Sequence, residues 1–194
     1  GNISFVTSPS ETIFAAHIDA VCSGDADVPN ELYIEGMIVS AKDHQLGADD
    51  GAGIYLLLEL MRHKVPGRFI FTRGEEVGGL GARYLEENFD FTPYKRSICF
   101  DRRGTTEVIT HQSGERGASD EFGEALVDAL NQCQNLLYMT SDAGIFTDNA
   151  LWFDLVPESV NVACGYSGEH SKNEFQDLTH LEALAAAVIK IDWE

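Results

Sequence analysis

The stretch LGADDGAGIYLLLELMRH, residues 46–63, joins two adjacent acids to an apolar segment with helical periodicity. We expect a helix over residues 51–63, because apolar side chains recur there at helical spacing, namely Ile54, Leu57, Leu58 and Met61. One Asp would be enough to cap such a helix, yet Asp49 and Asp50 lie side by side between small residues. Two neighbouring carboxylates repel each other unless a cation compensates them, so the stretch indicates a metal site where a helix begins.

Short apolar runs alternate with helical patterns on both sides of this stretch. The sequence predicts strands at residues 12–16, 32–39, 69–72, 98–100 and 160–163, and further helices at residues 80–88, 119–132 and 178–191. This alternation predicts an α/β fold, a three-layer sandwich with a mixed, largely parallel central sheet flanked by helices. We expect residues 1–194 to form a single domain without a lid or dimerisation domain, since the stretch between Asp101 and Ser141 is too short for an inserted domain.

Composition narrows the range of partners. The net charge of −19 makes nucleic acid and anionic membranes unfavourable partners, because both are polyanions. No apolar run approaches about 18 residues and there is no charged-then-apolar leader, so we expect a cytoplasmic protein. The four cysteines lack CxxC spacing, and we expect free, buried thiols with two disulfides as the alternative: Cys22, Cys99, Cys133 and Cys164.

Residues that can bind metals follow several of the predicted strands. His17 and Asp19 project on the same side of an extended segment, so the carboxylate could support a metal-bound imidazole. Taken alone, the pair is better explained by a buried histidine with one hydrogen bond. Adjacent glutamates, Glu75 and Glu76, follow the strand at 69–72, and one of them could bind a metal while the other faces the substrate.

Two further positions complete the candidate site. Asp101 ends an apolar strand, and His170 lies in a loop of small residues after another strand. Together with His17, Asp49 and one glutamate they supply two imidazoles and three carboxylates, a ligand set that suits zinc, cobalt or manganese. If one acid bridges two ions, each ion has three protein ligands and room for a shared water.

The order of these motifs resembles that of the co-catalytic zinc peptidases, which include zinc aminopeptidases, peptidase T and glutamate carboxypeptidases. The matching segments are AHIDAV (16–21), LGADDGAG (46–53), EEVGGLGA (75–82), CFDRRG (99–104) and GEHSKNEF (168–175). The resemblance implies that Asp49 bridges two metals, that His17 and Asp101 bind one of them, and that Glu76 and His170 bind the other. It also implies a cis peptide between Asp49 and Asp50.

The same resemblance assigns roles beside the metals. It makes Glu75 the general base and Asp19 the acid that supports His17. Tyr138 stands where some zinc aminopeptidases carry a tyrosine that stabilises the oxyanion, although LLYM also fits a plain strand. Ser141 and Asp142 resemble the Ser/Thr–Asp segment that precedes the last strand in this family.

The sequence therefore predicts a metal-dependent hydrolase of peptide bonds, an exopeptidase of the aminopeptidase type that uses a water bridging two ions, with zinc as the expected metal. The expected substrate is a small peptide or an N-acyl amino acid. One alternative is a carboxypeptidase or an N-acyl amino acid deacylase, in which Arg102 or Arg103 would bind the substrate carboxylate. A metal-binding protein without catalysis is the other alternative, but it would have no use for Glu75. Side-chain preference and oligomeric state stay open.

Overall fold

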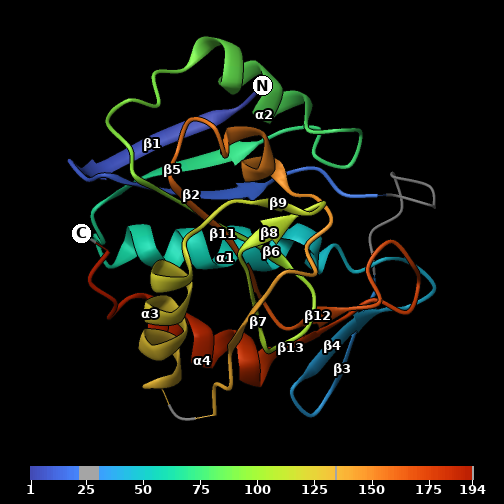
Figure 1. The fold of residues 1–194 in the computed structure, drawn as a ribbon. Helices are drawn as coiled ribbons and strands as arrows, with labels where there is room; N and C mark the ends of the chain where they lie inside the picture. The colour runs from blue at the N-terminus through green and yellow to red at the C-terminus, as the bar shows by residue number, and fades with distance from the viewer. Residues whose placement is uncertain (22–30, 134, 194) are drawn as a thin grey trace.

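A mixed seven-stranded sheet forms the centre of the molecule in the computed structural model, which describes residues 1–21, 31–133 and 135–193 (Figure 1). Its spatial order is β1 (Ile3–Ser8), β5 (Gly67–Thr72), β2 (Thr12–His17), β6 (Arg96–Arg102), β11 (Glu158–Ala163), β7 (Glu107–Ile109) and β10 (Met139–Ser141). The four strands β5, β2, β6 and β11 are mutually parallel, whereas β1 and β7 run antiparallel to β5 and β11. The predicted sheet, mixed and largely parallel, is confirmed.

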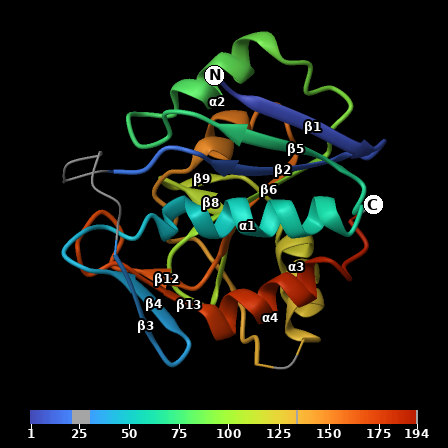
Figure 2. The ribbon, with the colours of Figure 1, turned by 180° about the vertical axis from the view of Figure 1, so that it is seen from behind.

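Helices cover both faces of this sheet. The larger core lies between the sheet and α1 (Ala48–Arg62), α3 (Asp120–Asn131) and α4 (Leu178–Val188). Figure 2 shows α1 and α4 crossing that face. The smaller core holds α2 (Leu80–Asn88) and the 3₁₀ helix η1 (Asp148–Trp152). Successive residues of β2 alternate between the two cores, with Phe14 in the larger and Ile13 in the smaller, as the period of two in a strand requires. The three-layer sandwich is therefore confirmed.

A second, four-stranded sheet lies beside the end of α1 that carries the two acids. It consists of β12 (Tyr166–Ser167), β13 (Phe175–Asp177), β4 (Ile38–Ala41) and β3 (Leu32–Glu35). The single strand expected over residues 32–39 is wrong, because Gly36 at φ 62° reverses the chain and divides the segment into the hairpin β3–β4. The remaining strands, β8 (His111–Gln112) and β9 (Glu115–Arg116), form a short hairpin of their own.

Two expectations from composition concern membranes and thiols. Among the described residues, no helix combines the length and the apolar character needed to cross a membrane. Cys99, Cys133 and Cys164 are free thiols, and burial raises the pKa of Cys99 and Cys164 well above the ordinary value. Cys22 lies outside the described residues.

Candidate active site

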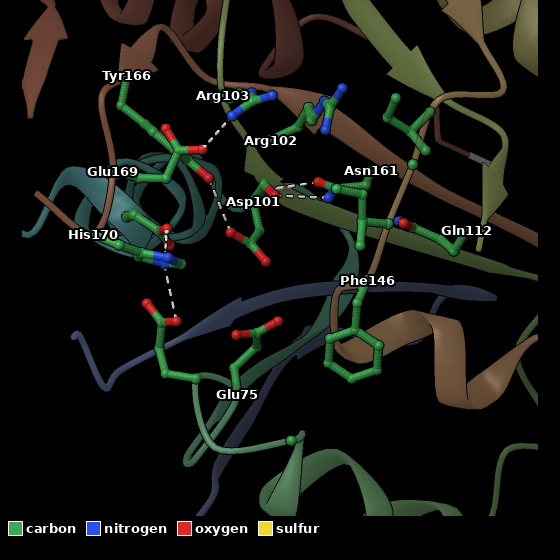
Figure 3. A pocket seen from close by; sticks show the side chains of 16 residues that line it. Glu75, Asp101, Arg102, Arg103, Gln112, Phe146, Asn161, Tyr166, Glu169 and His170 are labelled. Carbon is green, nitrogen blue, oxygen red and sulfur yellow. Dashed lines mark hydrogen bonds and ion pairs between the residues drawn. The ribbon is translucent and has the colours of Figure 1, made fainter.

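The carboxyl ends of three parallel strands bring the predicted residues to one edge of the sheet. His17 is the last residue of β2, Glu75 follows β5 by three residues, and Asp101 lies near the end of β6. The start of α1 adds Asp49, and the loop after β12 adds His170. Side chains collect here because strand ends in open α/β sheets leave a crevice between the flanking loops. A cavity of about 370 Å³ lies at this edge and has Asp49, Glu75, Glu76, Asp101 and His170 in its wall (Figure 3).

Asp49 lies between the two histidines. Its Oδ1 is 2.9 Å from Nε2 of His17, and its Oδ2 is 3.1 Å from Nε2 of His170. The peptide between Asp49 and Asp50 is cis, as the family resemblance led us to expect. The carboxylate of Asp49 therefore presents one oxygen to each imidazole, which is the arrangement that a bridging ligand needs.

One further acid accompanies each histidine. Asp101 Oδ1 lies 3.6 Å from Nε2 of His17, and Glu76 Oε2 lies 3.0 Å from Nε2 of His170. The five side chains thus divide into two sets, His17 with Asp101 and His170 with Glu76, that share Asp49. This division is the one that the family resemblance implies.

Asp50 lies beside this cluster and stabilises the backbone. It is 1% exposed, its Oδ2 accepts a hydrogen bond from the backbone N–H of His17 at 3.1 Å, and its Oδ1 accepts one from Gly53 at 3.0 Å. Ligand atoms of His17, Asp50 and Asp101 also lie within 4.8 Å of one another. Both Asp50 oxygens already accept hydrogen bonds from backbone N–H groups, so we assign this acid a structural role. That role explains why a second acid follows Asp49.

The electrostatics of the cluster call for a cation. Burial raises the pKa of Asp49 and of Glu76, and burial together with the nearby Asp101 raises the pKa of Glu75 to about 8. Burial alone would lower the pKa of His17, but the neighbouring carboxylates of Asp101 and Asp49 raise it overall. Oε1 of Glu76 is buried without a hydrogen-bond partner among the described residues. An unused buried oxygen in a crowd of carboxylates and imidazoles fits one or more divalent metal ions.

Asp19 performs a different task from the expected one. Its backbone carbonyl, not its carboxylate, faces Nδ1 of His17 at 2.8 Å, while the carboxylate lies 3.8 Å from that nitrogen. The carboxylate instead accepts hydrogen bonds from three successive backbone N–H groups, those of Gly74, Glu75 and Glu76, at 2.6, 3.2 and 3.3 Å. A turn with three free N–H donors binds a carboxylate more strongly than one imidazole N–H does, so we expect Asp19 to act mainly on the turn of Glu75.

The structure does not place Tyr138 in the cavity. The residue is 4% exposed, and its hydroxyl donates a hydrogen bond to the carbonyl of Ala163 at 2.5 Å and lies 2.8 Å from Nε2 of His180. Its side chain therefore packs against His180 of α4 and has no access to a substrate carbonyl. The oxyanion role inferred for it has no support in this geometry.

Sequence reasoning missed a Ser/Thr–Asp pair that does contact the site. The hydroxyl of Thr147 donates to Oδ2 of Asp101 at 2.5 Å, and Asp148 accepts a hydrogen bond from Thr72 at the end of β5. Ser141, which we had matched to this segment, instead donates to Glu107 at 2.7 Å. The signal was present in the sequence, because Thr147–Asp148 is also a Ser/Thr–Asp pair and also precedes the last long strand.

Glu174 is a second omission. It is 2% exposed, and its two oxygens accept hydrogen bonds from the backbone N–H groups of Gly47 and Asp49 at 2.9 and 3.0 Å. It lay within the quoted segment GEHSKNEF, but nothing in the sequence linked it to residues so far away along the chain.

The fold and this cluster of acids and histidines define the class of metal-dependent peptide hydrolases. The chain belongs to peptidase family M28, whose model matches residues 3–152. No curated protein matches the chain.

Solved structures of peptidases share the fold. The aminopeptidase PepT from Bacillus cereus ATCC 10987 superposes with a TM-score of 0.75 at 17% identity, over 97% of this chain and 83% of that one. A tripeptidase from Staphylococcus aureus gives 0.74 at 14% identity, over 97% and 82%. An aminopeptidase from the archaeon Desulfurococcus kamchatkensis gives 0.65 at 19% identity, over 84% and 52%.

Proposed function

We propose that this protein is an aminopeptidase-type exopeptidase that removes the N-terminal residue from short peptides with the help of two divalent ions, preferably zinc. The observation that carries the proposal is the position of Asp49, whose two oxygens face His17 and His170 at 2.9 and 3.1 Å. Membership of peptidase family M28 supports the same reaction.

The donor set suggests how two ions would be held. One ion would take His17 and Asp101, the other would take Glu76 and His170, and Asp49 would serve both. Bound ions of this kind act as Lewis acids and stabilise negative charge that develops on oxygen during hydrolysis. Cobalt and manganese accept the same nitrogen and oxygen ligands, so reconstitution with each metal would identify the one that supports activity best.

Glu75 is the proposed general base. Its carboxylate lines the cavity beside the ligands, and the turn that carries it is fixed by Asp19 through the N–H of Glu75 itself at 3.2 Å. Glu75 would accept a proton from the attacking water and then pass that proton to the nitrogen of the leaving amine. A base that both takes and gives a proton must be held close to the reacting atoms, which is what a fixed turn provides.

The charges around the cavity favour an aminopeptidase over a carboxypeptidase or deacylase. Recognition of a substrate carboxylate needs a free cation, and Arg102 and Arg103 are the arginines that line the cavity. Arg102 donates to Glu107 at 2.7 and 2.9 Å, and Arg103 forms an ion pair with Glu169 at 3.0 Å. Both guanidinium groups are therefore already neutralised, which leaves an acidic cavity suited to a substrate with a free amine.

A reducing compartment, namely the cytoplasm, is the proposed location. The three cysteines that the structure describes are free thiols, which is the usual state in such a compartment.

Paired substrates test the proposal. The purified protein would be reconstituted with zinc, cobalt or manganese and given peptides with a free N-terminus beside the same peptides with an acetylated one. We expect release of the first residue from the free peptides only. Deacetylation of the blocked peptides would replace the aminopeptidase with a deacylase, release of the C-terminal residue from either set would replace it with a carboxypeptidase, and no cleavage of either set would point to a metal-binding protein without catalysis.

A further inference from the structure

The cavity continues past the proposed metal ligands. Its far end, on the side of Asn161 away from His170, holds Gln112 and Phe146 (Figure 3), and Ile109 and Ile145 also line the cavity. Ile109 is almost fully buried, and Phe146 is 37% exposed. This end is therefore a largely apolar recess with two amides in its wall, Gln112 and Asn161, and the amide of Asn161 is already hydrogen-bonded to the backbone of Asp101.

Gln112 is buried in that wall, and the hydrogen bonds of its side-chain amide are incomplete among the described residues. The residue is 4% exposed, and its Nε2 has no hydrogen-bond partner among the described residues. A buried amide donor without a partner destabilises a fold, so such groups are rare unless something else, such as a ligand, completes them. Gln112 also lines the cavity, so a bound substrate is the partner that we consider for this amide.

The backbone around Gln112 is shaped to hold the amide in place. Gln112 forms a parallel bridge with Gly144, and a Cβ atom at residue 144 would lie 2.1 Å from the carbonyl oxygen of His111 and 2.6 Å from Oε1 of Gln112. Only glycine permits so close an approach. The segment at residue 144 thus forms one wall of the recess and limits how the amide can move.

We propose that Gln112 selects peptides whose N-terminal residue has a side chain ending in a primary carboxamide, that is, glutamine or asparagine. The inference rests on the proposed function, since an aminopeptidase has one residue before the scissile bond and the recess would receive its side chain. A carboxamide is the complement of Gln112, because two amides exchange a donor and an acceptor with each other.

Charged side chains fit this recess less well. An acidic side chain would need a free cation, but Arg102 and Arg103 are paired with Glu107 and Glu169. A basic side chain would leave the Nε2 donor of Gln112 without an acceptor. Apolar side chains would fill the space but would also leave that donor unpaired, and a site built around a hydrogen bond discriminates against analogues that cannot make it.

The test compares aminoacyl para-nitroanilides of glutamine, asparagine, methionine, glutamate and lysine. For the zinc-loaded protein we expect kcat/KM for glutamine to exceed that for methionine, its apolar near-isostere, by about tenfold or more. Gln112→Met should lower the value for glutamine about tenfold and leave methionine within about twofold. Gln132→Met, at an exposed position after α3, is the matched control and should change neither value.

Two further measurements separate this inference from its alternatives. The thermal midpoint of Gln112→Met should not fall, because the substitution removes a group that has no partner. A lower midpoint with an unchanged preference would show that Gln112 only packs the wall, and would overturn the inference.

Calorimetric binding of Gln-Ala and Met-Ala to zinc-loaded Glu75→Gln protein gives a readout without turnover. A preference for Gln-Ala that disappears on adding Gln112→Met would support the recess even if hydrolysis, and with it the proposed function, failed.

Discussion

Glu174 fixes the backbone of Asp49, with Oε1 accepting the N–H of that residue at 3.0 Å while Oε2 accepts the N–H of Gly47 at 2.9 Å. The two acids are 125 positions apart in the chain. Each oxygen of the Glu174 carboxylate accepts one backbone N–H of this turn. These two hydrogen bonds fix the turn and therefore the direction of the Asp49 side chain. The proposed bridging ligand is therefore oriented by a residue that would not contact the metals.

Glu174→Gln should weaken zinc binding about 10- to 100-fold, because the amide keeps one acceptor and turns a donor toward a backbone N–H. Competition with a fluorescent chelator measures the affinity. Glu158→Gln is the matched control, since Glu158 also accepts a backbone N–H, that of Ser119 at 2.8 Å, but far from the metals. Equal losses of affinity in both variants would contradict the orienting role.

Glu75→Gln and Glu76→Gln should behave differently although the residues are adjacent. Loss of the proposed general base in Glu75→Gln should lower turnover by about two to four powers of ten and leave the metal content nearly unchanged. Loss of a charged ligand in Glu76→Gln should remove metal along with activity, and added zinc should restore part of both. Metal analysis beside steady-state kinetics separates the two, and full activity in Glu75→Gln would exclude the mechanism.

Asp19→Asn should lower kcat about 10- to 100-fold while zinc binding changes less, since Asp19 holds the turn of Glu75 and contacts the His17 ring mainly through its backbone carbonyl. Kinetics and zinc affinity measured on the same preparation would show the difference. Asp90→Asn is the control, because Asp90 accepts two hydrogen bonds from Thr92 in an exposed turn. A loss of affinity as large as the loss of kcat would return Asp19 to the role of supporting His17.

Tyr138→Phe should leave kcat/KM unchanged and lower the free energy of unfolding by about 1 kcal/mol, the usual effect of losing a buried hydrogen bond. The hydroxyl lost is the one that donates to Ala163 at 2.5 Å. Denaturant titration and kinetics measure the two effects. A fall in kcat of a hundredfold or more at unchanged stability would instead revive a role at the oxyanion.

Removal of metal should make stability depend on pH. In the metal-free protein the pKa of Glu75 is raised to about 8 and that of Asp148 to about 6, in both cases chiefly by burial. The folded state then binds more protons than the unfolded state, so stability should fall as pH rises from about 4.5 toward 8. Thermal midpoints with and without chelator should diverge over this range, and parallel curves would show that the acids do not need a cation.

The sequence predicted best those strands and site residues that a clear pattern of residue types marks. The buried parallel strands β2, β5, β6 and β11 were predicted because their apolar runs are flanked by turns, and the acids and histidines were predicted because they follow those strands in a recognisable order. Short strands were missed, since the three residues of β7 or of β10 are too few to show a period. The edge strand β1 was missed as well, because most of its residues are exposed and no alternation of burial marks it.

The supporting residues were missed for another reason. Thr147 and Glu174 act on Asp101 and on the backbone of Asp49 from 46 and 125 residues away. Such partners are set by the path of the chain in space, and a single sequence contains no periodicity that reveals them. The contacts of the Asp19 carboxylate with the turn were missed for the same reason, because the three N–H groups that it binds become available only when the turn after β5 has formed.

Asp101 is held from several directions at once. Asn161 spans its backbone, accepting from the N–H at 2.8 Å and donating to the carbonyl at 2.7 Å, while Thr147 and Tyr166 donate to its carboxylate at 2.5 and 3.1 Å. During synthesis, a chain that ends before residue 147 already contains four of the five proposed ligands but neither His170 nor any of these three partners. If the proposed site binds zinc, an unfinished chain would hold the ion weakly, and tight binding would require the folded domain, so that metal loading would follow folding.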